Sequence, residues 1–280
     1  MRIKVTSDST CDLPKALLDA HNITLTPLTV IKNDEAFKDG VTISPAEIFA
    51  HVAAGGALCS TSACSVGDYI DHFESFQGTC DGIVHISLGS GFSASYQNAC
   101  LAAQEFDNVC VIDSMNLSTG QGHVVLKACE LARTAQSLDA LKEELEAFVP
   151  KVEASFLVDK LDYLVKGGRC SSAAALGANL LNLKPCIEVR EGKMSVVKKY
   201  RGNYAKCLAS YVKERLSGRE DLDTGILFIT QTKLSDECYA AVKEAVAANS
   251  AFDNVYETVA GCTVSCHCGP GTLGAIFVRK

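Results

Sequence analysis

The sequence predicts an α/β protein made of two α/β domains, residues 1–152 and 153–280. In the first half, short β-branched runs alternate with helical patterns, which is typical of a mostly parallel sheet. In the second half, two strand patterns flank Glu191-Gly192 and predict an antiparallel hairpin, so the second sheet is expected to be mixed. The pattern resets around Pro150, and a chain of 280 residues is long for one domain.

The composition is that of a globular protein with a large core, because 48% of the residues are hydrophobic and 21% are charged. The net charge of −7 argues against nonspecific binding to nucleic acid. No run of residues has the pattern of a signal peptide or a membrane span, and the 14 cysteines are scattered through predicted strands and helices. We therefore expect a cytoplasmic protein whose thiols are reduced and act as small core residues.

The first half contains the elements of a parallel sheet in order. Strands are expected at residues 3–7, 23–31, 83–86 and 109–112. Helices are expected at residues 14–21, 44–55, from 65 onward, after 93, at 120–133 and at 138–149. The last is the clearest, because apolar residues recur on one face and charged residues on the other.

The second half is expected to hold the mixed sheet. Its predicted strands are residues 156–158, 186–190, 194–200, 226–230, 255–259 and 273–278. Its predicted helices are residues 159–166, 173–183, 204–216 and 235–248, of which 173–183 is small and apolar. A loop of Gly, Pro and His residues is expected around His267, because Gly269-Pro270-Gly271 is a strong turn signal.

Residues 82–106 combine a buried strand, a loop of Gly and Ser residues, and a helix. This geometry directs backbone N–H groups and hydroxyls at an anion. Ser93 stands where the helix begins, so its alternative role is that of a simple N-cap.

Three separate loops of small residues carry hydrogen-bond donors, namely Thr61-Ser62, Ser93 and His267. Together they would form a site for a carboxylate or phosphate without a fixed positive charge. None of the three loops contains an arginine. A bidentate arginine would hold a carboxylate more tightly and reduce its reactivity, so we expect an acid bound here to keep a reactive oxygen.

A serine hydrolase is the alternative function. The stretch around Ser93 is one residue away from the G-x-S-x-G motif, with Ser95 in place of the last glycine. His267 would be the general base and Asp253 would orient it.

Metal and nucleotide sites are not expected. Cys262, Cys266, His267 and Cys268 lie too close together for the usual paired zinc ligands. The sequence contains neither G-x-x-x-x-G-K-[ST] nor a G-x-G-x-x-G after a strand, so we expect no cofactor.

The charge is unevenly divided between the halves. Residues 1–150 carry 8 Lys and Arg against 19 Asp and Glu, whereas residues 151–280 carry 18 against 14. The difference is either ordinary variation of solvated faces or a basic surface for an acidic partner. Arg169, Lys198, Lys199 and Arg201 are the candidates for such a surface.

Six motifs resemble the DegV family, in the same order and over nearly the whole chain. They are DSTCDLP (8–14), TSACS (61–65), ISLGSGFSASYQNA (86–99), VIDSMNLSTGQG (111–122), FLVDKLDYLVKGGR (156–169) and HCGPG (267–271). The chain departs from the family pattern at Cys64, at Cys170 and in the loop of Ser93. These departures leave the hydroxyls and the imidazole in place but affect the shape of the loop and the size of the ligand.

The resemblance implies a fatty acid buried between two domains, with its carboxylate held by Thr61, Ser62, Ser93 and His267. Members of the family act as fatty-acid-binding subunits of a bacterial fatty acid kinase. They present the carboxylate to an ATP-using subunit that makes acyl phosphate for phospholipid synthesis. The chain is then a lipid carrier and not an enzyme, with peripheral membrane contact during lipid exchange. Apart from the resemblance, we predict that Arg169 and Arg201 help to dock the kinase subunit, because they lie in the positively charged half of the chain. Acyl chain length and unsaturation stay open.

Overall fold

The computed structural model describes residues 1–175 and 183–280, whose strands form three sheets. The strands are β1 (Ile3–Asp8), β2 (Thr24–Thr26), β3 (Thr29–Lys32), β4 (Glu35–Lys38), β5 (Ser60–Ser62), β6 (Gly82–Ser87), β7 (Val109–Asp113), β8 (Val152–Leu157), β9 (Leu183–Arg190), β10 (Lys193–Arg201), β11 (Leu222–Gln231), β12 (Asn254–Val259) and β13 (Leu273–Arg279). The helices are α1 (Lys15–Ala20), α2 (Pro45–Ala53), α3 (Val66–Glu74), α4 (Ser95–Ala103), α5 (Thr119–Leu131), α6 (Leu138–Phe148), α7 (Asp162–Gly167), α8 (Ser171–Ala174), α9 (Tyr204–Leu216), α10 (Asp236–Asn249) and α11 (Cys262–Cys268), with short 3-10 turns at Ser9–Cys11 and Val149–Lys151.

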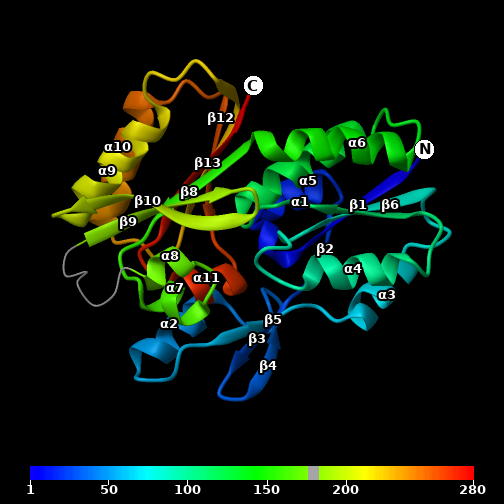
Figure 1. The fold of residues 1–280 in the computed structure, drawn as a ribbon, viewed down its shortest axis with the longest axis horizontal. Helices are drawn as coiled ribbons and strands as arrows, with labels where there is room; N and C mark the ends of the chain where they lie inside the picture. The colour runs from blue at the N-terminus through cyan, green and yellow to red at the C-terminus, as the bar shows by residue number, and fades with distance from the viewer. Residues whose placement is uncertain (176–182) are drawn as a thin grey trace.

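The predicted fold class is confirmed. A parallel sheet of order β2-β1-β6-β7 forms from the first half, and a mixed sheet of order β10-β9-β8-β13-β11-β12 forms from the second. The hairpin of β9 and β10 is antiparallel, as the sequence predicts. In Figure 1 the two sheets lie on opposite sides of the molecule, with α9 and α10 on the outer face of the mixed sheet. The division into domains at residue 152, where β8 begins, stays a prediction.

Three sequence predictions differ from the structure. The strand expected at residues 23–31 is divided at Pro27, which has no N–H to give to a sheet, and its two parts belong to different sheets. Its second part, β3, pairs with β4 and β5 in a small antiparallel sheet that the sequence did not predict. The loop expected at His267 is wrong, because this residue lies in the last turn of α11. The helix expected at residues 173–183 lies mostly outside the described residues.

Strand β13, in the middle of the mixed sheet, is apolar on both faces because both faces are covered. On β13, Leu273, Ala275 and Phe277 pack in a cluster with α9 and α10, whereas Ile276 and Val278 pack in the cluster that contains the first sheet. This alternation follows from the two-residue period of a strand. The cluster that contains Ile276 and Val278 includes residues of both halves of the chain, so the two sheets share a core.

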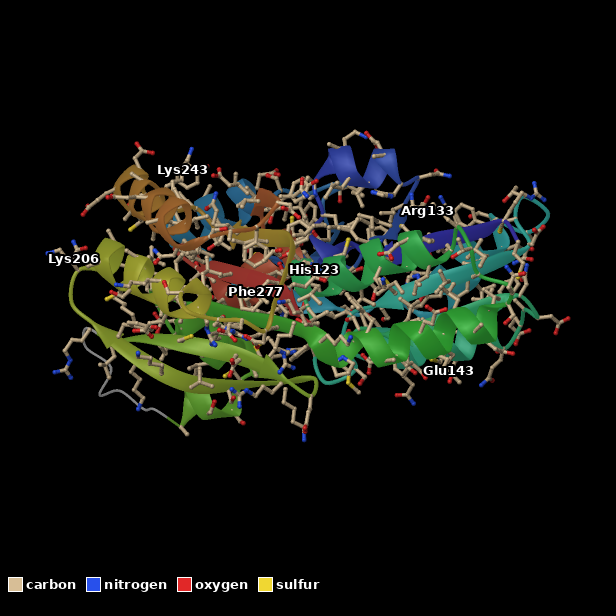
Figure 2. All side chains as sticks on the ribbon, turned by 90° about the horizontal axis from the view of Figure 1, so that it is seen from above. His123, Arg133, Glu143, Lys206, Lys243 and Phe277 are labelled. Carbon is tan, nitrogen blue, oxygen red and sulfur yellow. The ribbon has the colours of Figure 1, made fainter. Side chains whose placement is uncertain are left out.

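Helix α5 joins the two sheets, since it packs against β1 and β6 of one and β8 and β13 of the other. His123, on α5, places its Nε2 3.3 Å from the carbonyl oxygen of Ile276 and its ring against Phe228. Figure 2 shows His123 and Phe277 inside the molecule, and Lys206 and Lys243 on its outer surface. In the described ranges 1–175 and 183–280, no helix is long and apolar enough to cross a membrane.

A buried carboxylate fixes the carboxyl ends of β1 and β6. One oxygen of Asp8 accepts from the Tyr69 hydroxyl at 2.6 Å and lies 3.2 Å from His85 Nε2. The other accepts from the Ser87 hydroxyl at 2.8 Å and the Leu88 N–H at 2.7 Å. Burial by itself would raise the pKa of Asp8, but the hydrogen bonds and the charge of His85 outweigh it and hold the pKa below its ordinary value.

Asp8→Asn should therefore destabilise the protein by about 2–4 kcal/mol, because an amide cannot accept all of these bonds. Urea unfolding at pH 7 measures the loss. The loss should shrink as the pH falls below about 4. In that range Asp8 of the unfolded wild-type chain takes up a proton, whereas in the folded protein it does so only at its lower pKa, so the wild type loses stability. Asp81→Asn, which breaks an exposed pair with Arg2, is the control and should have a much smaller effect. Equal effects of the two substitutions would contradict the prediction.

Candidate functional site

The residues predicted to bind a carboxylate meet at one pocket. Thr61 and Ser62 come from β5, Ser93 from the loop between β6 and α4, and His267 from α11, and all four line this pocket. The pocket holds about 520 Å³ of space between atoms, counted out to its open mouth. We call it the head-group pocket. The structure thus brings together the three loops that the sequence singled out, while their role toward a ligand stays a prediction.

His267 is buried and hydrogen-bonded to Thr61, with its Nε2 2.8 Å from the Thr61 hydroxyl oxygen. Burial, together with the positive charge of Arg169, lowers the pKa of His267 to about 4, so the imidazole is neutral near pH 7. No partner for Nδ1 is present among the described residues. A proton on Nε2 therefore leaves no unpaired N–H, and it makes His267 the donor to Thr61. The hydroxyl proton of Thr61 is then free for a ligand.

Gly167 is required by the position of the His267 ring. A Cβ atom at residue 167 would lie 2.4 Å from His267 Nδ1, which is far inside van der Waals contact. Only glycine allows α7 to approach the ring so closely. This contact explains in physical terms why the KGGR and HCGPG motifs occur together in this chain.

The Ser93 hydroxyl has two functions in the structure. Its oxygen accepts from the Ser95 N–H at 3.1 Å, at the start of α4, and lies 2.9 Å from the Ser95 hydroxyl. The same side chain lines the head-group pocket. The N-cap of α4 is Ala94, so the alternative role of Ser93 as N-cap is wrong, although its oxygen accepts from the first amide of the helix. The hydroxyl can still donate to a ligand.

Helix α11 is held by two carboxylates from the start of the chain. Asp39 accepts from the N–H groups of Cys262 at 2.9 Å and Thr263 at 3.2 Å, and Asp12 accepts from the Gly261 N–H at 2.9 Å. The N–H groups at the start of a helix have no partner within the helix, and the oxygens of these two side chains accept from them. These contacts hold the helix that carries His267 at the pocket.

Asp12 is protonated in the folded protein near neutral pH. Burial raises its pKa to about 8, and the nearby Asp39 adds to the shift, although hydrogen bonds from Ser118 and Gly261 oppose it. Its second oxygen accepts a hydrogen bond from the Ser118 hydroxyl at 2.6 Å.

Arg169 lies at the pocket, which the sequence did not predict. It lines the wall, its Nη1 donates to the Gly167 carbonyl at 2.6 Å, and its Nε donates to the Phe92 carbonyl at 3.4 Å. The three loops contain no arginine, but the expectation of a site without a fixed positive charge is wrong, because the segment between α7 and α8 brings Arg169 to the pocket. Arg201 is exposed at the end of β10 and is not among the described residues that line the pocket.

An apolar channel continues from the head-group pocket toward the mixed sheet. Leu117, Val264 and Cys268 line both spaces, and the channel holds about 400 Å³ of space between atoms, counted out to its open side. Its further walls include Phe156 of β8 and Ile276 of β13. The small apolar helix expected to line this space falls largely on residues 176–182, outside the described part of the chain.

The geometry does not favour a serine hydrolase. His267 bonds to Thr61, and no hydrogen bond between His267 and Ser93 occurs in the part of the chain that the structure describes. Asp253 is exposed and does not line the pocket, whereas a triad needs a carboxylate on the second nitrogen of the histidine.

No metal centre is formed by the residues in the two described ranges, where no three His, Cys, Asp or Glu side chains are grouped to hold an ion. Cys262, Cys266 and Cys268 are free and buried. Burial raises the pKa of each of these thiols, so they are protonated near pH 7.

Known proteins share this fold and much of this sequence. A family model described as an uncharacterised protein of the DegV family matches residues 2–280. A DegV domain-containing protein from Clostridium acetobutylicum is 30% identical over 283 residues, covering 100% of this chain and 99% of that protein. A solved structure that reports fatty acid binding by a DegV family protein from Thermus thermophilus has a TM-score of 0.89 and 31% identity, with 100% of both chains covered. A stearic acid-binding protein from Eubacterium ventriosum has a TM-score of 0.84 and 26% identity, covering 99% of this chain and 98% of that one.

Asp12→Asn should change how stability depends on pH. The wild-type protein takes up a proton at Asp12 on folding, because the pKa of this group is about 4 in the unfolded chain and about 8 in the folded protein. The stability of the wild type therefore falls as the pH rises between these two values. An amide can donate to Ser118 and accept from Gly261 without titrating. The variant should therefore gain stability relative to wild type between pH 5 and pH 8, measured by urea unfolding. Parallel curves for the two proteins would show that Asp12 is ionised throughout.

Proposed function

The chain belongs to the DegV family, and from this premise we propose that it binds a long-chain fatty acid. Its carboxylate would occupy the head-group pocket at Thr61, Ser93 and His267. One observation carries the proposal: hydroxyls and a neutral imidazole line one end of a space that continues between apolar walls past Leu117 and Val264. A fatty acid has the same division into a polar and an apolar part. The relatives described as binding fatty acids and stearic acid support this choice of ligand.

Burial of the acyl chain supplies the affinity. Transfer of a sixteen-carbon chain from water yields roughly 11–12 kcal/mol at about 0.8 kcal/mol per methylene group. Association costs several kcal/mol of this, and the remainder is sufficient for a tight complex.

Hydrogen bonds from neutral groups hold the carboxylate in this proposal. His267 donates to Thr61, and the hydroxyls of Thr61 and Ser93 donate to the ligand. The Ser62 hydroxyl, which here lies 3.3 Å from the Ala63 carbonyl, can rotate toward the same site. The Arg169 guanidinium at the wall reduces the cost of bringing a negative charge into the pocket. One carboxylate oxygen stays available for reaction.

We further infer that the chain presents this carboxylate to a kinase subunit. A carboxylate oxygen would attack the γ-phosphorus of an ATP bound to that subunit, and acyl phosphate and ADP would result. The resemblance of the sequence to carrier subunits of fatty acid kinase supports this step. In this role the chain binds and positions the substrate and performs no catalysis of its own.

Ser93→Ala should weaken fatty acid binding by about 10- to 100-fold, the usual cost of a lost hydrogen bond to a charged group. Native mass spectrometry and organic extraction first identify what the purified protein carries, and calorimetry with stearate on delipidated protein then gives the affinities. Ser90→Ala is the matched control, because Ser90 is exposed in the same loop and does not line the pocket. Unchanged affinity in Ser93→Ala would contradict the head-group assignment.

Arg201→Glu should leave stearate affinity unchanged and slow acyl phosphate formation by the partner kinase at least tenfold, because Arg201 is exposed and away from the pocket. Arg169→Glu should impair both, since Arg169 lines the pocket. A coupled assay for ADP with purified kinase subunit measures the rate. Full activity of Arg201→Glu at subsaturating kinase would exclude Arg201 from the docking surface.

A further inference from the structure

Helix α11 presents a second polar side chain to the head-group pocket. Thr263 lies four residues before His267, so the two side chains share one face of the helix, and both line the pocket. A rise of about 1.5 Å per residue separates them by about 6 Å along the helix axis. Thr263 thus lies one helical turn before His267, whose imidazole is hydrogen-bonded to Thr61.

The Thr263 hydroxyl is buried and unpaired. Only 5% of the residue is exposed, and its Oγ1 has no hydrogen-bond partner within residues 1–175 and 183–280. Its backbone N–H donates to Asp39, which fixes the residue in the wall of the pocket. A buried hydroxyl without a partner is rare in folded proteins because it has lost its hydrogen bonds to water.

A second threonine of the same pocket shows the usual arrangement. Thr10 is also buried, and its hydroxyl donates to the side-chain oxygen of Gln121 at 2.8 Å. Thr10 therefore uses its donor within the protein. Thr263 keeps its donor free within the wall of the pocket that, under the proposed function, holds the lipid.

We propose that the Thr263 hydroxyl donates a hydrogen bond to an oxygen atom of the bound lipid. The inference rests on the proposed function and adds a binding residue to Thr61, Ser93 and His267. An oxygen acceptor would pair the hydroxyl, whereas a plain methylene chain beside it would leave it unpaired. The oxygen belongs either to the carboxylate itself or to a hydroxyl group carried by the acyl chain near its head.

Thr263→Val tests the proposal because valine has almost the same shape as threonine and lacks only the hydroxyl. Binding of palmitate and of 3-hydroxypalmitate to delipidated protein is measured by calorimetry for the wild type, Thr263→Val, Thr263→Ser and Thr10→Val. We expect Thr263→Val to lose about tenfold in affinity and Thr263→Ser to retain the wild-type value. A loss for both acids assigns the contact to the carboxylate, and a loss for the hydroxy acid alone assigns it to the acyl hydroxyl.

Thermal unfolding of the delipidated variants separates binding from folding. Thr263→Val removes no hydrogen bond within the described protein, so its melting temperature should equal or exceed that of the wild type. Thr10→Val removes the bond to Gln121 and should melt at a lower temperature.

Wild-type affinity of Thr263→Val for both acids would overturn the inference while leaving the proposed function intact. A wild-type protein that binds neither acid would instead overturn the proposed function, and the inference with it.

Discussion

The binding site depends on the attachment of helix α11 to the start of the chain. A helix of seven residues rich in Cys, Thr, Val and Ser has little stability of its own. Asp12 and Asp39 accept the hydrogen bonds of its first amides, more than two hundred residues away in sequence. Because α11 supplies His267 and Thr263 to the pocket and Val264 to the channel, both spaces exist only while these carboxylates hold the helix.

The molecule holds two kinds of carboxylate environment. Asp8 is surrounded by four donors and is a permanent part of the core. The donors of the head-group pocket are neutral except for Arg169, whose guanidinium is already engaged with backbone carbonyls of Gly167 and Phe92. A ligand acid held in this way would be less tightly bound than the Asp8 carboxylate and could react and leave, as the proposed carrier role requires.

Sequence patterns predicted the parallel sheet, the hairpin and most helices because those elements show their period locally. The small sheet of β3, β4 and β5 could not be predicted, since strands of three or four residues carry almost no periodic signal. Helix α11 was missed for another reason, which is that its stability comes from distant Asp12 and Asp39. With α11 taken as a loop, the four-residue spacing of Thr263 and His267 carried no meaning. Arg169 was seen as surface charge, because the contact of α7 with α11 that brings it to the pocket is purely tertiary.

Helices α7 and α11 pack closely because a ring from each helix lies against a glycine of the other segment. The His267 ring occupies the space that a side chain at Gly167 would need, and the Tyr163 ring lies 2.6 Å from where a Cβ of Gly269 would be. Neither glycine can be replaced while the opposite ring is present. The two glycines differ in one respect: loss of the His267 ring would make room for a side chain at residue 167, whereas the positive φ of 73° at Gly269 favours glycine even without the Tyr163 ring.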